Sequence, residues 1–307
     1  MASDELSFES YIEQRKSGAF GRDEAARYAY SADIAMLNGF SRLRPVELAA
    51  AAVVRTGGEM LKGQLLGQAV KVGPKQFPRI YDIAKHCADT LHVPVPQLYI
   101  VNSPIPNAMT FGTDDDSVIL VHSALIDNFS EKELQFVIGH ETGHIQNKHV
   151  VYGTALQILT NGAGLLLAWI VQPALVALQA WYRRAEITCD RAGLLCCRDE
   201  HAAVGSFMKL AIGSTRLFNE MNVDAYLDQL EEGRKSVGRY GEVFVSHPYL
   251  PKRIRALRTF AESSLYRQTM GLEGGASMEE IDERTSRIIS IDGGAPETTK
   301  TNEENSQ

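Results

Sequence analysis

Residues 140–144 read His-Glu-Thr-Gly-His, and they lie in a segment whose pattern predicts a helix. Two histidines four residues apart on a helix project from one face, one turn apart, so both imidazoles can reach a single ion. Glu141 sits about 100° around the helix from His140, close to such an ion but poorly placed to ligate it. That is where a general base for a metal-activated water belongs. The chain must therefore fold so that this helix face meets a further metal ligand.

The flanking residues predict that this helix is buried on one side. Ser130 followed by Glu133 forms a capping box, which marks a helix start. Hydrophobic residues then recur at helical spacing, at Leu134, Val137, Ile138 and Ile145. The two histidines fall on or beside this stripe and should point inward. The alternative, two core histidines held only by hydrogen bonds, is disfavoured by the complete His-Glu-x-x-His pattern.

Composition describes an ordinary globular protein of 307 residues with a net charge of −7. No basic block stands out, which argues against nucleic acid as a partner. The four cysteines lack the paired spacing of a structural zinc finger, and adjacent Cys196 and Cys197 cannot easily bridge each other, so we expect a reduced, intracellular setting. The acidic, polar first residues do not resemble a signal peptide. We therefore expect a cytoplasmic protein that is not secreted.

A small β-sheet is predicted just upstream of the buried helix. Residues 79–91 form an amphipathic helix pattern, and three apolar, β-branched segments follow at 97–101, 107–112 and 117–121. The three aspartates within 113–116 lack the alternating spacing of a calcium loop, so a solvated hairpin turn is favoured there. The expected fold class is α+β, mostly helical, with a small sheet beside the metal helix.

A catalytic zinc site needs a third protein ligand and leaves one position for water. A metzincin would supply a histidine six residues after His144, but position 150 is valine, and His149 is rotated off the ligand face. Glu186 and Asp190 are four residues apart on a second predicted helix, hence on one face. One carboxylate could bind the metal while the other receives the free N–H of a ligating histidine. An exposed acidic pair among arginines is the alternative.

The order of these motifs resembles the HtpX and CaaX-prenyl-protease (Ste-type) zinc metallopeptidases, which are gluzincins. The resemblance rests on His140-Glu-x-x-His144 followed by Glu186-x-x-x-Asp190. Three further segments are similar to that family and occur in the same order: Pro106-Asn-Ala108 through Gly112, Ser123-Ala-Leu-Ile with Glu133-Leu, and Ser246-His-Pro248 with Arg253-Ile254. It covers roughly residues 75–260.

The resemblance implies that His140, His144 and Glu186 bind one Zn²⁺ per chain. It further implies that Glu141 is the catalytic base and that Asp190 orients His140.

Four other positions receive roles from the resemblance. Asn107 and Ala108 would form the edge strand on which a peptide substrate lies. His247 and, with less support, Arg253 are catalytic candidates that would approach the scissile carbonyl and stabilise the oxyanion. His247 reads equally well as an ordinary helix-start residue before Pro248.

The implied architecture is a zincin-like (gluzincin) metallopeptidase fold. We expect a helical N-terminal extension over 1–75, a zinc metallopeptidase domain over 76–265 and a mostly disordered tail over 266–307, with disorder from about residue 290. The expected function is zinc-dependent metalloendopeptidase activity on protein or peptide substrates, with protein quality control as a candidate setting. The alternative is a latent or non-catalytic member that binds peptides as a chaperone or scaffold. A zinc hydrolase of non-peptide amides is a weaker option.

Residues 151–182 carry no acidic residue, lysine or arginine, and so raise the question of a membrane. His144 and Glu186 must meet at one ion, which excludes a single span between them. Two spans need about 40 apolar residues plus a turn, more than the segment offers. We therefore expect a helical hairpin broken near Asn161–Gly164 or Gln172-Pro173. It could be buried in the fold, form an oligomer contact, or contact a membrane surface peripherally.

Overall fold

The helix that carries the pentapeptide, α7 (Glu131–Gln146), packs along α9 (Gly164–Cys197), a helix of 34 residues. The structure is a computed structural model that describes residues 27–42, 54, 63, 67–113, 116–160, 164–234 and 249–290. The capping box at the start of α7 is confirmed, with the Ser130 amide donating to Glu133 Oε2 at 2.6 Å and the Glu133 amide donating to Ser130 Oγ.

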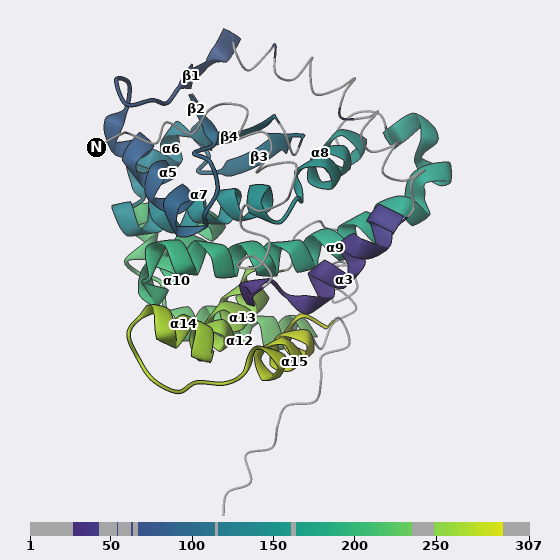
Figure 1. The fold of residues 1–307 in the computed structure, drawn as a ribbon, viewed down its shortest axis with the longest axis vertical. Helices are drawn as coiled ribbons and strands as arrows, with labels where there is room; N and C mark the ends of the chain where they lie inside the picture. The colour runs from purple at the N-terminus through teal and green to yellow at the C-terminus, as the bar shows by residue number, and fades with distance from the viewer. Residues whose placement is uncertain are drawn as a thin grey trace, which may run out of the picture.

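A four-stranded sheet lies on one side of α7 (Figure 1). Its strands are β1 (Ala69–Lys71), β2 (Gln97–Val101), β3 (Ala108–Gly112) and β4 (Ser117–His122). Their spatial order is β1-β2-β4-β3, with β2 parallel to β4 and the outer pairs antiparallel. The three strands expected from sequence are confirmed, whereas β1 was not predicted. β3 therefore stands at an edge of the sheet, beside the metal helix.

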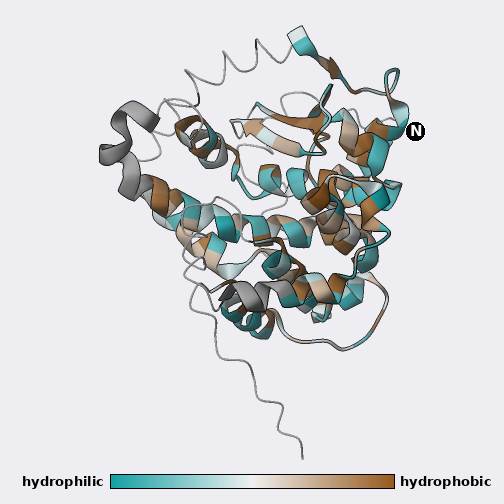
Figure 2. Cartoon of the chain, turned by 180° about the vertical axis from the view of Figure 1, so that it is seen from behind, coloured by the Kyte–Doolittle hydropathy of each residue, from teal (hydrophilic) through white to brown (hydrophobic). Residues whose placement is uncertain are grey.

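The side chains of the sheet alternate between two apolar clusters, as strand geometry requires. Leu98, Ile119 and Val121 join the main core with Leu134 and Ile138 of α7. The opposite face forms a separate cluster, made by Tyr99, Phe111, Val118 and Leu120. In Figure 2 the strands are mainly hydrophobic, as this burial on both faces demands.

The other helices surround the α7–α9 pair. In chain order they are α3 (Ser31–Arg42), α5 (Pro78–Thr90), α6 (Ser123–Asn128), α8 (Val150–Ile158), α10 (Glu200–Ile212), α11 (Thr215–Phe218), α12 (Val223–Arg234), α13 (Leu250–Ala261), α14 (Ser264–Thr269) and α15 (Met278–Ile289). Figure 1 shows α9 running across the middle, with the sheet, α7 and α8 on one side and α10 and α13–α15 on the other. The predicted α+β, mostly helical class is confirmed.

Glycines allow α7 and α9 to cross closely in antiparallel fashion. A Cβ on Gly139 would lie 2.7 Å from the Cβ of Cys196, and one on Gly143 would lie 2.8 Å from the Cβ of Ala192. On the other helix, a Cβ on Gly193 would lie 2.6 Å from the carbonyl oxygen of Phe136. The glycine inside the His-Glu-Thr-Gly-His sequence is thus a packing residue that brings the two helices together.

Gly193→Ala should destabilise the fold by about 1–3 kcal/mol, because the added methyl group meets a backbone carbonyl that cannot move aside alone. Urea unfolding monitored by circular dichroism would measure the loss. Gly39→Ala in α3 is the matched control, since a Cβ there meets nothing within 4 Å. Equal stability of both variants would show that the crossing tolerates wider spacing.

The segment between His144 and Glu186 forms α8 and the first part of α9. The predicted break near Asn161–Gly164 falls on residues 161–163, which lie outside the described part between α8 and α9. The alternative break at Gln172-Pro173 is wrong, because Pro173 lies inside α9. Proline removes one backbone hydrogen bond, which a helix of this length survives. Among the described residues, no helix combines the length and apolar character needed to cross a membrane.

Two expectations about the chain ends are changed by the structure. The N-terminal extension contributes α3, but it ends in strand β1, so it is not wholly helical. The expected disordered tail begins with structure instead, since α15 buries Ile281 and Thr285 and packs against α13. Amphipathic spacing in 278–289 was the available signal. Residues 291–307 lie outside the described part.

Candidate metal centre

The two histidines of α7 point into the core at the crossing with α9. His140 and His144 are buried, and their ring centroids lie 5.0 Å apart. The sequence prediction that both face one point is therefore reproduced in the structure. The face of α7 that meets α9 is made by Gly139 and Gly143, not by the predicted apolar stripe, whose Leu134 and Ile138 pack with the sheet. The expectation that α7 is buried on one side only is wrong, because every residue from Glu133 to His144 is buried.

Glu186 of α9 completes a three-residue set at this point. Its Oε2 lies 3.6 Å from His140 Nε2, and its Oε1 lies 3.5 Å from His144 Nε2. These donor atoms lie within 4.8 Å of one another and all three residues are buried. Two imidazole nitrogens and a carboxylate are a donor set that catalytic zinc accepts, with a fourth position left for water. The residues present therefore fit a zinc ion.

Asp190, one turn after Glu186, lies behind His140. Its Oδ1 is 2.9 Å from His140 Nδ1, which leaves Nε2 of the same ring directed at Glu186. A carboxylate in this position fixes the tautomer of a metal-binding histidine and raises its basicity. Of the two carboxylates that sequence reasoning left open, Glu186 is thus placed toward both rings and Asp190 behind one of them.

Arg253 of α13 reaches the same two carboxylates and is itself buried. Its Nη1 lies 2.8 Å from Glu186 Oε2, and its Nη2 lies 2.6 Å from Asp190 Oδ1. Its Nε donates to Asp190 Oδ2 at 2.9 Å. The guanidinium is engaged in holding the acidic residues in place, which favours a positioning role over the oxyanion role that the resemblance implied.

Glu141 is buried beside the set and is held by the sheet. Thr110 Oγ1 of β3 lies 2.6 Å from Glu141 Oε2 and 3.1 Å from the Glu141 carbonyl oxygen. The hydroxyl can donate to the carboxylate and fix its orientation. Thr110 was not singled out from sequence, and its place within the expected strand was the only signal.

The pKa values of the two histidines are shifted in opposite directions. Burial alone would lower the pKa of His140, but the charge of Glu186 and the hydrogen bond and charge of Asp190 raise it above its ordinary value. Burial lowers the pKa of His144, and the carboxylate contacts only partly oppose this. His140 therefore holds a proton more tightly than His144, and a metal ion that binds both rings would have to displace that proton, so metal binding would release it.

The predicted substrate residues lie at the sheet edge. Asn107 is exposed, and its carbonyl oxygen accepts a hydrogen bond from the His122 amide at 2.9 Å. In this register every second residue of β3 forms hydrogen bonds with β4. This alternation turns the backbone groups of Ala108, Thr110 and Gly112 away from β4. The Gly112 amide donates to Thr154 of α8, at 3.0 Å. Ala108 and Thr110 thus form the outward part of the edge.

His144 has neighbours that sequence reasoning did not identify. Tyr182, one turn before Glu186 on α9, stacks on the His144 ring with a centroid distance of 5.5 Å. His149, whose spacing turns it off the ligand face of α7, is buried with Nδ1 3.3 Å from His144 Nδ1. Its other nitrogen lies 3.1 Å from Asp33 of α3. Spacing by four from Glu186 could have indicated Tyr182, but no pattern links Asp33 to the site.

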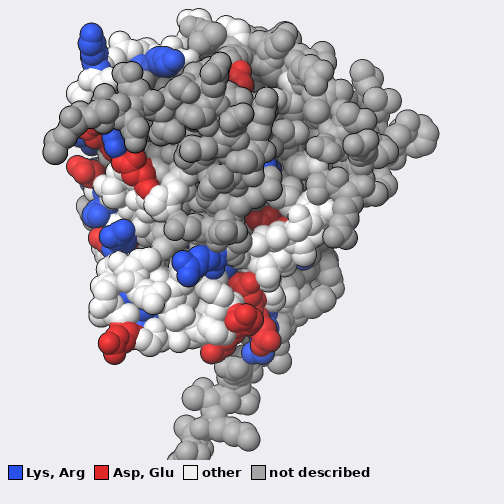
Figure 3. Space-filling model, viewed as in Figure 1, with Lys and Arg blue, Asp and Glu red and all other residues white. Residues whose placement is uncertain are grey.

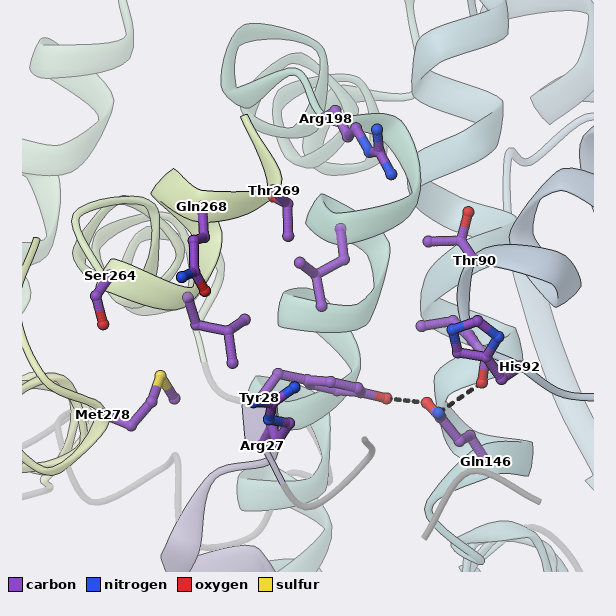
Figure 4. Close-up of a pocket in the computed structure, with 13 residues that line it drawn as sticks. Arg27, Tyr28, Thr90, His92, Gln146, Arg198, Ser264, Gln268, Thr269 and Met278 are labelled. Atoms are coloured by element: carbon purple, nitrogen blue, oxygen red, sulfur yellow. Dashed lines mark hydrogen bonds between the residues drawn. The ribbon is translucent and has the colours of Figure 1, made fainter. Parts of the chain in front are cut away.

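Two further features fall outside this cluster. His247 lies beyond the described residues, so its expected role stays a prediction. A cavity of about 680 Å³ lies between the ends of α5 and α7 on one side and α14 on the other (Figure 4). Gln146 closes one wall through hydrogen bonds with Tyr28 and with the Leu91 carbonyl. None of the predicted site residues that the structure describes lines it.

Charged side chains of the described residues can be followed on one face of the molecule. On the face shown in Figure 3, Lys and Arg side chains of the described residues are scattered among acidic ones and do not form one basic patch.

Comparison with known proteins assigns the chain to a family. Residues 74–261 match the description "Peptidase family M48". The chain is 34% identical over 220 residues to the plastoglobule-localized metallopeptidase 48, chloroplastic, of Arabidopsis thaliana, a match that covers 67% of this chain and 63% of the plant protein. A protease HtpX homolog of Tropheryma whipplei (strain Twist) is 25% identical over 224 residues, covering 63% of this chain and 76% of that protein. No solved structure gave a significant match. The chain therefore belongs to peptidase family M48 and has the zincin-like metallopeptidase fold of that family.

Proposed function

We propose that this chain is a zinc-dependent metalloendopeptidase in which His140, His144 and Glu186 hold the metal. The observation that carries the proposal is the convergence of two imidazole Nε2 atoms and one carboxylate at a buried point, with donor atoms within 4.8 Å of one another. Asp190 orients His140 through its Nδ1. Membership of a metallopeptidase family supports the same assignment.

Glu141 is proposed as the general base. When bound, zinc lowers the pKa of a coordinated water and polarises the scissile carbonyl. Glu141 then accepts a proton from the attacking water as the new C–O bond forms, and delivers that proton to the amine as the C–N bond breaks. The hydroxyl of Thr110 keeps the carboxylate of Glu141 in place for both transfers.

The substrate is proposed to bind as an extended strand along β3. The backbone groups of Ala108 and Thr110 face away from β4, so a peptide can add to this edge through main-chain hydrogen bonds. Thr110 also contacts Glu141, so a strand added at this edge would lie next to the proposed base. The exposed Asn107 side chain lies at the start of the same edge.

Casein cleavage and a peptide library read by mass spectrometry test this function. We expect hydrolysis that a chelator abolishes and added zinc restores. Peptide binding without hydrolysis by the zinc-loaded protein would favour the non-catalytic scaffold instead. Cleavage of small amides but not of peptides would favour a different hydrolase.

Glu186→Ala should lower zinc affinity by about 10- to 100-fold or more, because a metal ligand is lost and not only its support. Metal analysis after dialysis against a weak chelator measures this loss. Glu220→Ala is the control, since Glu220 is exposed. Unchanged zinc content in Glu186→Ala would assign the third ligand to another residue.

The cellular setting stays a prediction. We propose a cytoplasmic protein that acts in protein quality control, and identification of trapped substrates with an inactive variant would test that role. Fractionation of soluble and membrane extracts would test the location.

A further inference from the structure

The Nδ1 atoms of the two proposed metal-binding histidines have different partners. His140 has the carboxylate of Asp190 directly on its Nδ1, at 2.9 Å. His144 has instead the ring of a second histidine, since His149 Nδ1 lies 3.3 Å from His144 Nδ1. The other nitrogen of His149, Nε2, lies 3.1 Å from Asp33 Oδ2.

A tight turn places His149 there. The chain leaves α7 at Gln146 and turns through Lys148, whose φ of 60° is left-handed. The His149 amide donates to the His144 carbonyl at 2.9 Å, which closes the turn and brings the two rings together. His149 is 1% exposed, so no water competes for its nitrogens.

Asp33 is built to accept hydrogen bonds from several donors. Trp181 Nε1 donates to Oδ1 at 2.8 Å, and Thr188 Oγ1 donates to Oδ2 at 2.7 Å. Burial alone would raise the pKa of Asp33, but its contacts with His149 and these hydrogen bonds lower it below the ordinary value. An ionised carboxylate only accepts, so a hydrogen bond between His149 and Asp33 needs a proton on His149 Nε2.

The proton positions follow from the proposed metal bond. If Nε2 of His144 binds the metal, the proton of that ring lies on Nδ1 and can be donated to His149 Nδ1, 3.3 Å away. His149 then accepts at Nδ1 and carries its own proton on Nε2, toward Asp33. We propose that Asp33 and His149 form a hydrogen-bonded relay that fixes the Nδ1–H tautomer of His144 and so pre-organises it as a metal ligand.

Asp33 lies in α3, outside residues 74–261 that match the family. The N-terminal segment of this chain therefore supplies a positioning residue to the metal centre. His149 and Asp33 do not reach the reacting atoms in this arrangement; they act through His144.

Cys189 offers a competing arrangement at the same place. Its Sγ lies 3.6 Å from His149 Nδ1, and His144, His149 and Cys189 also form a set that could hold a metal. Burial raises the pKa of the Cys189 thiol well above its ordinary value, which keeps it protonated and disfavours this second set. His149 Nδ1 has one lone pair, so a thiol proton directed at it would compete with the His144 N–H; the S–H group is the weaker donor of the two.

Asp33→Asn is the direct test. An asparagine amide can turn an N–H toward His149 Nε2, which favours the opposite tautomer of His149 and places two N–H groups against each other at Nδ1 of the two rings. We expect the zinc dissociation constant, measured by competition with a chromogenic chelator, to rise about 10- to 100-fold.

Asp282→Asn is the matched control. Asp282 also anchors the N-terminal segment, because its Oδ2 accepts from the Ser31 amide at 2.9 Å and its Oδ1 pairs with Arg191. It does not contact His149. Both variants should lose stability, but only Asp33→Asn should lose zinc affinity. Equal loss in both would overturn the relay, because it would show that docking of α3 alone supports the site.

The wild-type protein gives an answer that does not depend on a folded variant. In zinc-loaded protein with ¹⁵N-labelled histidine, NMR should show a protonated Nε2 and a bare Nδ1 on His149. A protonated Nδ1 on His149, or two zinc ions per chain with His149 coordinated, would overturn the proposal. The inference rests on the proposed metal site, and the two fail differently: wild-type protein that binds no zinc contradicts the proposed function, whereas unchanged affinity in Asp33→Asn contradicts only the relay.

Discussion

Glu141→Gln should retain zinc at the wild-type level and lose peptide hydrolysis. The amide has the same shape as the carboxylate and keeps one oxygen that can accept from Thr110 Oγ1, so the fold and the metal-binding residues are preserved. It cannot accept a proton from water or deliver one to the leaving amine. A general base contributes about 10²–10⁴-fold to the rate, and kcat should fall by at least that factor.

Steady-state cleavage of a fluorogenic peptide, with zinc content determined on the same sample, measures both halves of this prediction. Glu131→Gln is the matched control, because it makes the same substitution on α7 at an exposed position. If Glu141→Gln kept more than a tenth of the wild-type kcat, the base would have to be another group.

Arg253→Met should destabilise the metal-free protein by about 3–5 kcal/mol, because removing one partner of a buried ion pair leaves charge uncompensated. The guanidinium lies within 2.8 Å of Glu186 and within 2.6 Å of Asp190, and both carboxylates are buried. Zinc bound by Glu186 would replace part of the lost positive charge. The deficit should therefore be clearly smaller in the zinc-loaded protein.

Urea unfolding with chelator and with excess zinc gives the two free energies. Arg258→Met, on the same helix but partly exposed at the surface, should change either value by less than about 1 kcal/mol. The oxyanion role that the sequence resemblance suggested for Arg253 makes the opposite prediction: normal stability in both states and a low kcat.

The parts of this site that sequence could predict are those set by local periodicity. Spacing by four on one helix places His140 with His144, and spacing by four on a second places Glu186 with Asp190. The capping box fixed the start of α7, and alternation located β2, β3 and β4. Each of these patterns relates residues that lie close together in the sequence, within one helix or one strand.

What sequence could not predict depends on contacts between distant segments. Asp33 approaches the centre from 111 residues before His144, and its environment is made by Trp181 and Thr188 of another helix. Arg253 was identified from a motif, yet its partners were visible only once α13 was placed against α9. The short strand β1 pairs with β2 over three residues, too few for alternation to be read.

If a peptide binds along β3 as proposed, that edge sets a condition on what can be cut. Ala108 and Thr110 turn backbone groups outward there, and the Gly112 amide is held by Thr154, so the edge offers a stretch of about 7 Å at roughly 3.4 Å per residue and would read mainly the main chain. In a folded substrate the backbone N–H and C=O groups are already hydrogen-bonded to each other. The substrate must therefore unfold locally before it can bind to this edge. Cleavage of a folded protein should then follow the population of its opened form, slowing about tenfold for each ~1.4 kcal/mol of added local stability. The local stability of the substrate protein, more than the identity of its side chains, would then determine how fast it is cleaved.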